Sequence, residues 1–266
     1  MYLEYLVRLI DAPPGTITPK NARGVLNAAL FQFGGSVPPA LFGHDADGRN
    51  LQTLYTLPGE RIQYAAPPVV AISGGQNFVR LTGIGPVGCD LLRGQIGQMA
   101  EAISRYTKQL YSIQTYSGSV GIEPSRPHLY HVGSMILQKN TKHLATLLPT
   151  DAAGRWQANF DDLVPHIEKA VVRGLTGQAL HLDALMPEAE QLFGRMPSDE
   201  RLAVKVLGGT TYFHAMSDKH KGAALAIRNL TFTLDAKLSG PWSIGQLRAH
   251  GFGAIRHAAA RRQEDV

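Results

Sequence analysis

The segment IGQLRAHGFGAI, residues 244–255, places three glycines and two basic side chains between two apolar runs that are typical of β-strands. Glycine adopts positive φ without a steric penalty, so such a loop can bring several backbone amides close to one phosphate group. Arg248 and His250 add positive charge to the same loop. The alternative interpretation is a glycine-rich β-turn that binds no ligand.

This segment resembles the C-terminal glycine-rich loop of the Cas-six family, the CRISPR RNA-processing endoribonucleases of the RAMP superfamily. Gly245, Arg248, Gly251, Phe252 and Gly253 match the family's pattern of glycines, a basic residue and G-F-G before an apolar strand. The run IRNLTFTLDAKLSGPWSIG before it is similar to the family's penultimate strand and linker. The resemblance predicts a protein that binds and cuts CRISPR repeat RNA.

The resemblance is carried by residues 225–257, and Ser243 departs from it where the family usually has its first glycine. Outside this stretch the chain agrees with the family only in total length and in the order of its elements. The compact size and the divergent N-terminal half point to an unusual branch, such as a type IV system.

The family's fold is α+β, with tandem ferredoxin-like units, and each half of the chain reads as strand, helix and further strands. We expect a first domain over residues 1–125 and a second over residues 126–266. Apolar residues at steps of three and four predict a helix over about 89–114. Because this helix follows a hairpin, it is expected to be a helical insertion that projects from the first domain.

The other elements follow from apolar periodicity and from residues that begin or end them. Thr18 and Pro19 are typical of a helix start, and Gly34 and Gly35 of a helix end. The elements expected are a strand at 2–10, a hairpin of 69–72 with 77–81, a strand at 127–138, an acidic helix at about 160–173, and strands at 202–207, 210–216 and 226–234.

Charge is distributed unevenly along the chain, whose formal net charge is +5. Residues 80–143 carry seven basic and three acidic side chains, and residues 201–266 carry ten and four, whereas residues 144–200 carry four and nine. A basic excess in the middle and at the C-terminus indicates a polyanionic partner. The alternative is a solvated basic surface.

The composition also bears on the compartment. No apolar run is long enough for a membrane span, and the first residues read as a strand rather than a signal peptide. Cys89 is the only cysteine, which excludes an internal disulfide and a thiolate zinc cluster. We expect a cytoplasmic protein with no membrane association.

A dinucleotide-binding fingerprint, G-x-G-x-x-G, occurs at residues 83–88 and favours a remote alternative, a nucleotide-dependent oxidoreductase. Pro86 lacks the backbone donor that could meet a pyrophosphate. The acidic residue expected about 20 positions on would fall in a predicted helix rather than at a strand end. An ordinary glycine-rich turn is therefore the favoured interpretation.

The ten histidines show no metal-ligand motif such as H-E-x-x-H. His128 and His131 are three apart on a predicted strand and so face opposite sides. His214 and His220 flank a loop that contains Asp218. No G-x-S-x-G elbow is present, which argues against a serine hydrolase. We expect neither a metal nor a cofactor.

The resemblance implies a metal-independent cut in which the ribose 2′-OH attacks the adjacent phosphate. This reaction needs a base, an acid and a cation for the charge that develops on the phosphate. Family members place such groups on the first helix or the loop after it, which here hold Lys20, Arg23 and His44. These three are the predicted catalytic residues.

RNA contacts are predicted at the glycine-rich loop and on the long helix. Arg248 is expected to be exposed and to point toward RNA, and Phe252 is expected to be core. Arg105 and Lys108, three apart, are expected to contact the phosphates of the repeat hairpin. The residues predicted to bind RNA are Gly245, Arg248, His250, Gly251, Gly253, Arg105 and Lys108.

The partners expected are a hairpin of CRISPR repeat RNA and other subunits of a CRISPR ribonucleoprotein complex. A second interpretation stays open: a non-catalytic RAMP subunit that binds RNA as part of such a complex.

Overall fold

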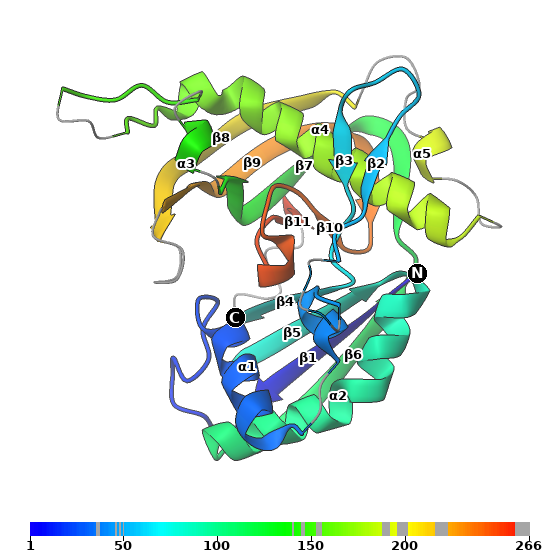
Figure 1. Cartoon of the computed structure of the whole chain (residues 1–266), viewed down its shortest axis with the longest axis vertical. Coiled ribbons are helices and arrows are strands. Elements are labelled where there is room, and N and C mark those ends of the chain that lie inside the picture. Colours follow the sequence, from blue (N-terminus) through cyan, green and yellow to red (C-terminus); the bar gives the residue numbers. More distant parts are fainter. Residues whose placement is uncertain are drawn as a thin grey trace.

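The computed structural model describes residues 1–35, 38–45, 47, 49, 51–139, 141–144, 147–152, 156–187, 192–195, 202–215 and 223–258. Within these residues the chain forms two antiparallel sheets, one in each half, and a separate two-stranded ribbon. Figure 1 shows the two sheets in two layers of the molecule, with the orange C-terminal segment between them.

The first sheet has the strand order β4-β5-β1-β6. Its elements follow one another as β-α-β-β-α-β, the order of a ferredoxin-like unit. Two helices, α1 and α2, pack against each other and against this sheet through buried aliphatic side chains. The elements are β1 (Tyr2–Leu9), α1 (Ala22–Phe33), β4 (Val70–Gly75), β5 (Phe78–Ile84), α2 (Gly85–Thr107) and β6 (Tyr111–Gly118).

The helix expected at 89–114 is present as α2, but its predicted role as a projecting insertion is wrong. Leu92, Met99 and Ile103 are fully buried in the core of the first unit. The helix therefore covers the sheet as the second helix of the ferredoxin-like unit. The spacing of its apolar residues correctly predicted a helix. Its position over the first sheet depends on contacts with β1 and β5, which the spacing does not specify.

The insertion of the first unit lies instead between α1 and β4. It contains the 3-10 helix η1 (Pro39–Phe42) and a ribbon formed by β2 (Leu54–Thr56) and β3 (Gln63–Ala65). Figure 1 shows this ribbon crossing the long helix of the second unit. A Cβ added to Gly177 on that helix would lie 2.3 Å from the carbonyl oxygen of Ala65, so the ribbon can dock only because glycine is present.

The second sheet has the order β10-β11-β7-β9-β8 and is covered by α4. A loop with a three-residue 3-10 helix, η2, stands where a ferredoxin-like unit would have its second helix. The elements are β7 (Gly121–Gln138), α3 (Thr141–Leu144), α4 (Phe160–Leu185), α5 (Leu192–Arg195), β8 (Val204–Ala215), β9 (Ala223–Ser239), β10 (Trp242–Ser243), η2 (Arg248–His250) and β11 (Ala254–His257).

The α+β fold with tandem ferredoxin-like units is confirmed, with local corrections. The two strands expected at 202–207 and 210–216 are one strand, β8, whose register shifts around Gly208. The first helix begins at Ala22, because Thr18 and Asn21 form a turn in which each backbone N–H donates to the other side chain. The boundary between domains 1–125 and 126–266 stays a prediction; β7 begins at Gly121.

The glycines of the dinucleotide fingerprint allow β5 and α2 to pack closely on each other and on the residue before β4. A Cβ on Gly83 would lie 2.5 Å from the carbonyl oxygen of Gly88, and one on Gly88 would lie 2.4 Å from that of Val69. The backbone N–H of Gly85 donates to the carbonyl of Met1. Close packing thus accounts for this motif without a nucleotide. None of the described helices is both long and apolar enough to cross a membrane.

Candidate nucleic-acid interface

The glycine-rich loop, residues 244–253, is held to β7 by backbone hydrogen bonds. The N–H of Gln246 donates to the carbonyl of Ile136 over 2.8 Å, and that of Gly253 to Ser134 over 2.7 Å. The N–H of Ile244 donates to Gly253 over 3.0 Å and closes the loop on itself. These bonds give the loop a defined shape before any ligand binds.

The loop glycines approach the protein's own backbone. Gly253 has φ +77°, and a Cβ there would lie 1.8 Å from the carbonyl oxygen of Ile244. Gly251 has φ +81°, and its Cβ would lie 2.7 Å from the carbonyl oxygen of Ile72 on β4 of the first unit. Gly245, at φ +76°, packs on Met135. The close approach predicted toward RNA phosphate is therefore made to the fold, and any RNA contact of these glycines stays a prediction.

Arg248 is buried, which contradicts the expectation of an exposed side chain. Only 6% of its surface is exposed. Its Nη2 donates to the carbonyl oxygens of Ala65 over 2.8 Å and Ala66 over 2.6 Å. Burial lowers the pKa of its guanidinium to about 10. The acceptors lie more than 180 positions away at the end of the ribbon, so the sequence offered no sign of them.

Arg23 connects the first helix to the same loop. Its Nη1 donates to the carbonyl of Ala249 over 2.6 Å, and its guanidinium lies over the ring of Phe42 at 5.4 Å from the centroid. Burial lowers the pKa of Arg23. This predicted catalytic residue therefore lies beside the backbone that carries His250.

Four basic side chains lie close enough to His250 for their charges to lower its pKa. Arg23 lies on α1, His44 in the turn after η1, Lys139 directly after β7, and His214 on β8. Together with His250 they form what we call the His250 cluster.

The imidazole of His250 is accessible to solvent, yet it is closely surrounded by protein. Burial, followed by the charges of Arg23, His214, His44 and Lys139, lowers its pKa to about 4. His250 is therefore neutral at pH 7. A neutral imidazole among cations can accept a proton, while the cations attract a phosphate.

The cluster combines predicted residues with two that sequence reasoning missed. Arg23, His44 and His250 were predicted, and the structure brings them together from segments about 200 positions apart in the chain. Lys139 and His214 were not predicted as part of the site. His214 was considered only with His220, which lies outside the described residues.

Aromatic contacts hold the loop against the second sheet. The half-buried ring of Phe252 packs on a small apolar cluster that includes Ile136, and His214 meets it edge-on with ring centroids 5.1 Å apart. The hydroxyls of Tyr212 and Ser134 share a hydrogen bond, and the guanidinium of Arg228 lies 4.7 Å from the centroid of the Tyr212 ring. Phe252, expected to be core, is half-buried; its ring packs the loop against the second sheet and contacts His214.

The remaining predicted residues lie apart from the cluster. Lys20 is exposed in the turn before α1. Arg105, near the C-terminal end of α2, donates to Glu101 over 2.8 Å, and Lys108 is the left-handed cap of the same helix. None of the three is among the charges that act on His250. Their roles in catalysis or RNA binding stay predictions.

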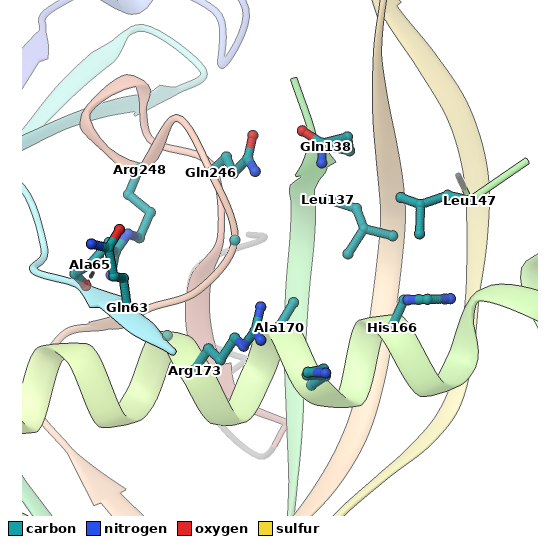
Figure 2. Close-up of a pocket in the computed structure, with 13 residues that line it drawn as sticks. Gln63, Ala65, Leu137, Gln138, Leu147, His166, Ala170, Arg173, Gln246 and Arg248 are labelled. Atoms are coloured by element: carbon teal, nitrogen blue, oxygen red, sulfur yellow. Dashed lines mark hydrogen bonds between the residues drawn. The ribbon is translucent and has the colours of Figure 1, made fainter. Parts of the chain in front are cut away.

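A cavity of about 310 Å³ lies between α4, the end of β7 and the glycine-rich loop. Figure 2 shows Arg173 on α4 pointing toward the loop that carries Gln246, whereas His166 lies farther along the helix beneath Leu147. The basic residues of α4 were missed because the segment 144–200 is acidic overall. The spacing of His166, Lys169 and Arg173, at steps of three and four, could have revealed one basic helix face.

Solved structures of CRISPR RNA-processing proteins share this fold. The chain matches "Csf5, CRISPR-Cas type IV Cas6 crRNA endonuclease" with TM-score 0.60 at 15% identity, covering 96% of this chain and 98% of that one. It matches "Crystal structure of Cas6b" with TM-score 0.56 at 12% identity, covering 97% and 100%. A second Cas6b endoribonuclease matches with TM-score 0.53 at 11% identity. No curated protein sequence matches the chain significantly.

Two ferredoxin-like units joined through a C-terminal glycine-rich loop place the chain in the Cas6-like fold class. A family model narrows this class, because the model of the type IV CRISPR-associated endonuclease Csf5 matches residues 5–260. The chain belongs to this family.

Proposed function

We propose that the protein cleaves CRISPR repeat RNA at the His250 cluster, by attack of a ribose 2′-OH on the adjacent phosphate and without a metal ion. The observation that carries this proposal is the exposed His250 next to Ala249, whose carbonyl accepts a hydrogen bond from Arg23, with other basic side chains close enough to lower the pKa of His250. The family relationship supports RNA processing or binding, and the cluster supplies groups suited to cleavage.

Each group has a role that fits its surroundings. His250 accepts the proton of the 2′-OH, because it is neutral at pH 7. Arg23 lies beside it and stabilises the negative charge that develops on the phosphate oxygens. His44, exposed on the facing turn, donates a proton to the departing 5′-oxygen when it is protonated. Lys139 holds the phosphate by charge.

The proposed substrate is the hairpin of the repeat, and the product would pass to other subunits of a CRISPR ribonucleoprotein complex. We place this reaction in the cytoplasm, which fits a chain with a single cysteine. The alternative, a subunit that binds RNA without cutting it, is favoured by one observation: Arg23 already donates to the carbonyl of Ala249 and so has less freedom to act on a phosphate.

The experiment is incubation of the purified protein with its cognate repeat RNA in EDTA. We expect one cut that leaves a 5′-hydroxyl and a 2′,3′-cyclic phosphate. RNA with a 2′-deoxyribose at the cut site should bind and stay intact, because the nucleophile is missing. A strict requirement for magnesium contradicts the mechanism, and binding without any cleavage of the natural repeat establishes the alternative.

A matched pair of variants tests the location of the site. His250→Ala should abolish most cleavage and keep RNA binding, because the proton acceptor is lost while the cations remain. Arg93→Ala, a change of an exposed residue of α2 outside the cluster, should cut at the wild-type rate. If the two variants cut equally well, the active site lies elsewhere.

A further inference from the structure

Three of the α4 residues that line the cavity are basic. His166, Lys169 and Arg173 are all exposed and lie on one face of the helix. Seven residues of helix extend about 10 Å, so the basic face is longer than a single phosphate group. No aspartate or glutamate is among the described residues that line the cavity.

Arg248 contributes a buried cation to the opposite wall. Its Nη2 donates to two carbonyl oxygens, but its buried Nη1 has no hydrogen-bond partner among the described residues. Figure 2 shows its side chain extending from the loop toward Ala65. Buried polar groups almost always have a partner, and a buried charge without one is costly. Arg248 lines the cavity, so a ligand there would lie beside an incompletely partnered guanidinium.

The groups around Arg248 do not neutralise it. Its described hydrogen bonds go to neutral carbonyls, and none of the described ion pairs involves it. His181 lies close enough that burial and the charge of Arg248 lower the His181 pKa, so that neighbour is neutral at pH 7. The wall therefore carries an uncompensated positive charge.

Gln246 adds an oriented amide to the same wall. Its Oε1 accepts a hydrogen bond of 2.9 Å from the backbone N–H of Lys139, which leaves its Nε2 group as a donor. Neutral donors beside cations are the usual surroundings of a phosphate group in a protein site.

We propose that this cavity binds backbone phosphates of the RNA strand, as a second contact separate from the His250 cluster. The proposal rests on the proposed function in one respect, that RNA is the ligand. RNA fits better than a free phosphate because the cations extend over about 10 Å of helix and face open solvent. The loop joins the two sites, since Arg248 lines the cavity while His250, two residues later, lies in the cluster.

The test is a charge reversal on α4, Lys169→Glu together with Arg173→Glu. The matched control is Lys205→Glu together with Lys237→Glu, two exposed cations of β8 and β9 that do not line the cavity. Binding is measured with repeat RNA that carries a 2′-deoxyribose at the cut site, at several salt concentrations, so cleavage does not enter the result. Thermal melts check that each variant is folded.

The cavity variant should bind this RNA about tenfold more weakly or worse. Its salt dependence should be shallower by about 1.4 in log–log slope, because two phosphate contacts on a single strand are lost. The control variant should bind as the wild type does. Equal affinity and slope in the cavity variant and the wild type overturn the proposal, whether or not the wild type cleaves.

Pyrophosphate distinguishes the source of the phosphate. If pyrophosphate raises the melting temperature of the wild type but not of the cavity variant, while RNA affinity is the same in both, the ligand is a small phosphate compound and the RNA proposal is wrong. If the wild type binds RNA through the cavity but never cuts it, the proposed cleavage fails and the RNA contact stands.

Discussion

Nη1 of Arg23 on α1 donates a 2.6 Å hydrogen bond to the carbonyl oxygen of Ala249, the residue before His250. A single side chain of the first unit thus fixes the backbone of the glycine-rich loop, which belongs to the second unit. The same guanidinium helps to lower the pKa of His250. Arg23 therefore links the two units and also influences the chemistry of the loop.

Arg23→Ala should reduce cleavage far more than RNA binding. Removal of a donor that stabilises developing charge costs about 10²–10³ in rate in well-studied enzymes. Single-turnover cleavage at saturating protein measures the rate, and titration of uncleavable RNA measures affinity. Arg23→Lys should recover only part of the rate, because an ammonium cannot bridge the Ala249 carbonyl and a phosphate as a guanidinium can. Wild-type rates for Arg23→Ala would contradict this role.

Acid should destabilise the protein through His250. The folded-state pKa of His250 is about 4, below the value near 6.5 of an unfolded histidine. Between these values the unfolded chain binds more protons than the folded chain, so stability is lost as the pH falls from about 6.5 to 4. Across this pH range, the melting temperature should fall less for His250→Ala than for the wild type. Parallel declines would show that other groups control acid stability.

RNA binding should raise the pKa of His250. A phosphate placed among the cations of the cluster offsets their charge and raises the pKa of His250. Complex formation near pH 5.5 should therefore take up protons, and calorimetry in two buffers of different ionisation enthalpy measures that uptake. The uptake should shrink in His250→Ala and persist in Arg93→Ala, a change of an exposed residue outside the cluster. No difference between these two variants would place the linked group elsewhere.

Arg248→Ala should destabilise the fold. It leaves the carbonyl oxygens of Ala65 and Ala66 without their donor, and an orphaned buried group costs about 1–3 kcal/mol. Removal of the buried charge offsets part of the cost of the two orphaned carbonyls. We therefore expect the free energy of unfolding, measured in urea, to fall by about 1–3 kcal/mol. Exposed Arg105→Ala should change stability by less than about 0.5 kcal/mol. Equal stabilities would mean that Arg248 does not hold the ribbon.

Gly253→Ala should disrupt the loop, and Gly133→Ala should not. A Cβ at position 253 would meet the carbonyl oxygen of Ile244 at 1.8 Å, at a φ of +77° that costs about 1–2 kcal/mol for an L-residue before any clash. Position 133 on β7 offers open space within 4 Å. Melting temperature and RNA affinity should both fall for the first variant only. Intact RNA affinity in a folded Gly253→Ala protein would show that the loop tolerates a different backbone.

The sequence by itself determined the order of elements and the nature of the C-terminal loop. Local patterns carry this information, because apolar steps of three and four specify α2 and alternating runs specify the strands. Glycines at 245, 251 and 253 mark positive φ, which is a property of the single residue. The choice of Arg23, His44 and His250 also came from the sequence and its family resemblance.

Only the tertiary structure decided what these residues touch. Arg248 is buried because two carbonyls at the end of a distant ribbon accept from it, and α2 covers the first sheet because β1 and β5 lie beneath it. Lys139 and His214 join His250 through folding of β7 and β8, and the basic face of α4 lies inside an acidic stretch of sequence. Burial and charge proximity depend on long-range contacts, and no local pattern of residues encodes them.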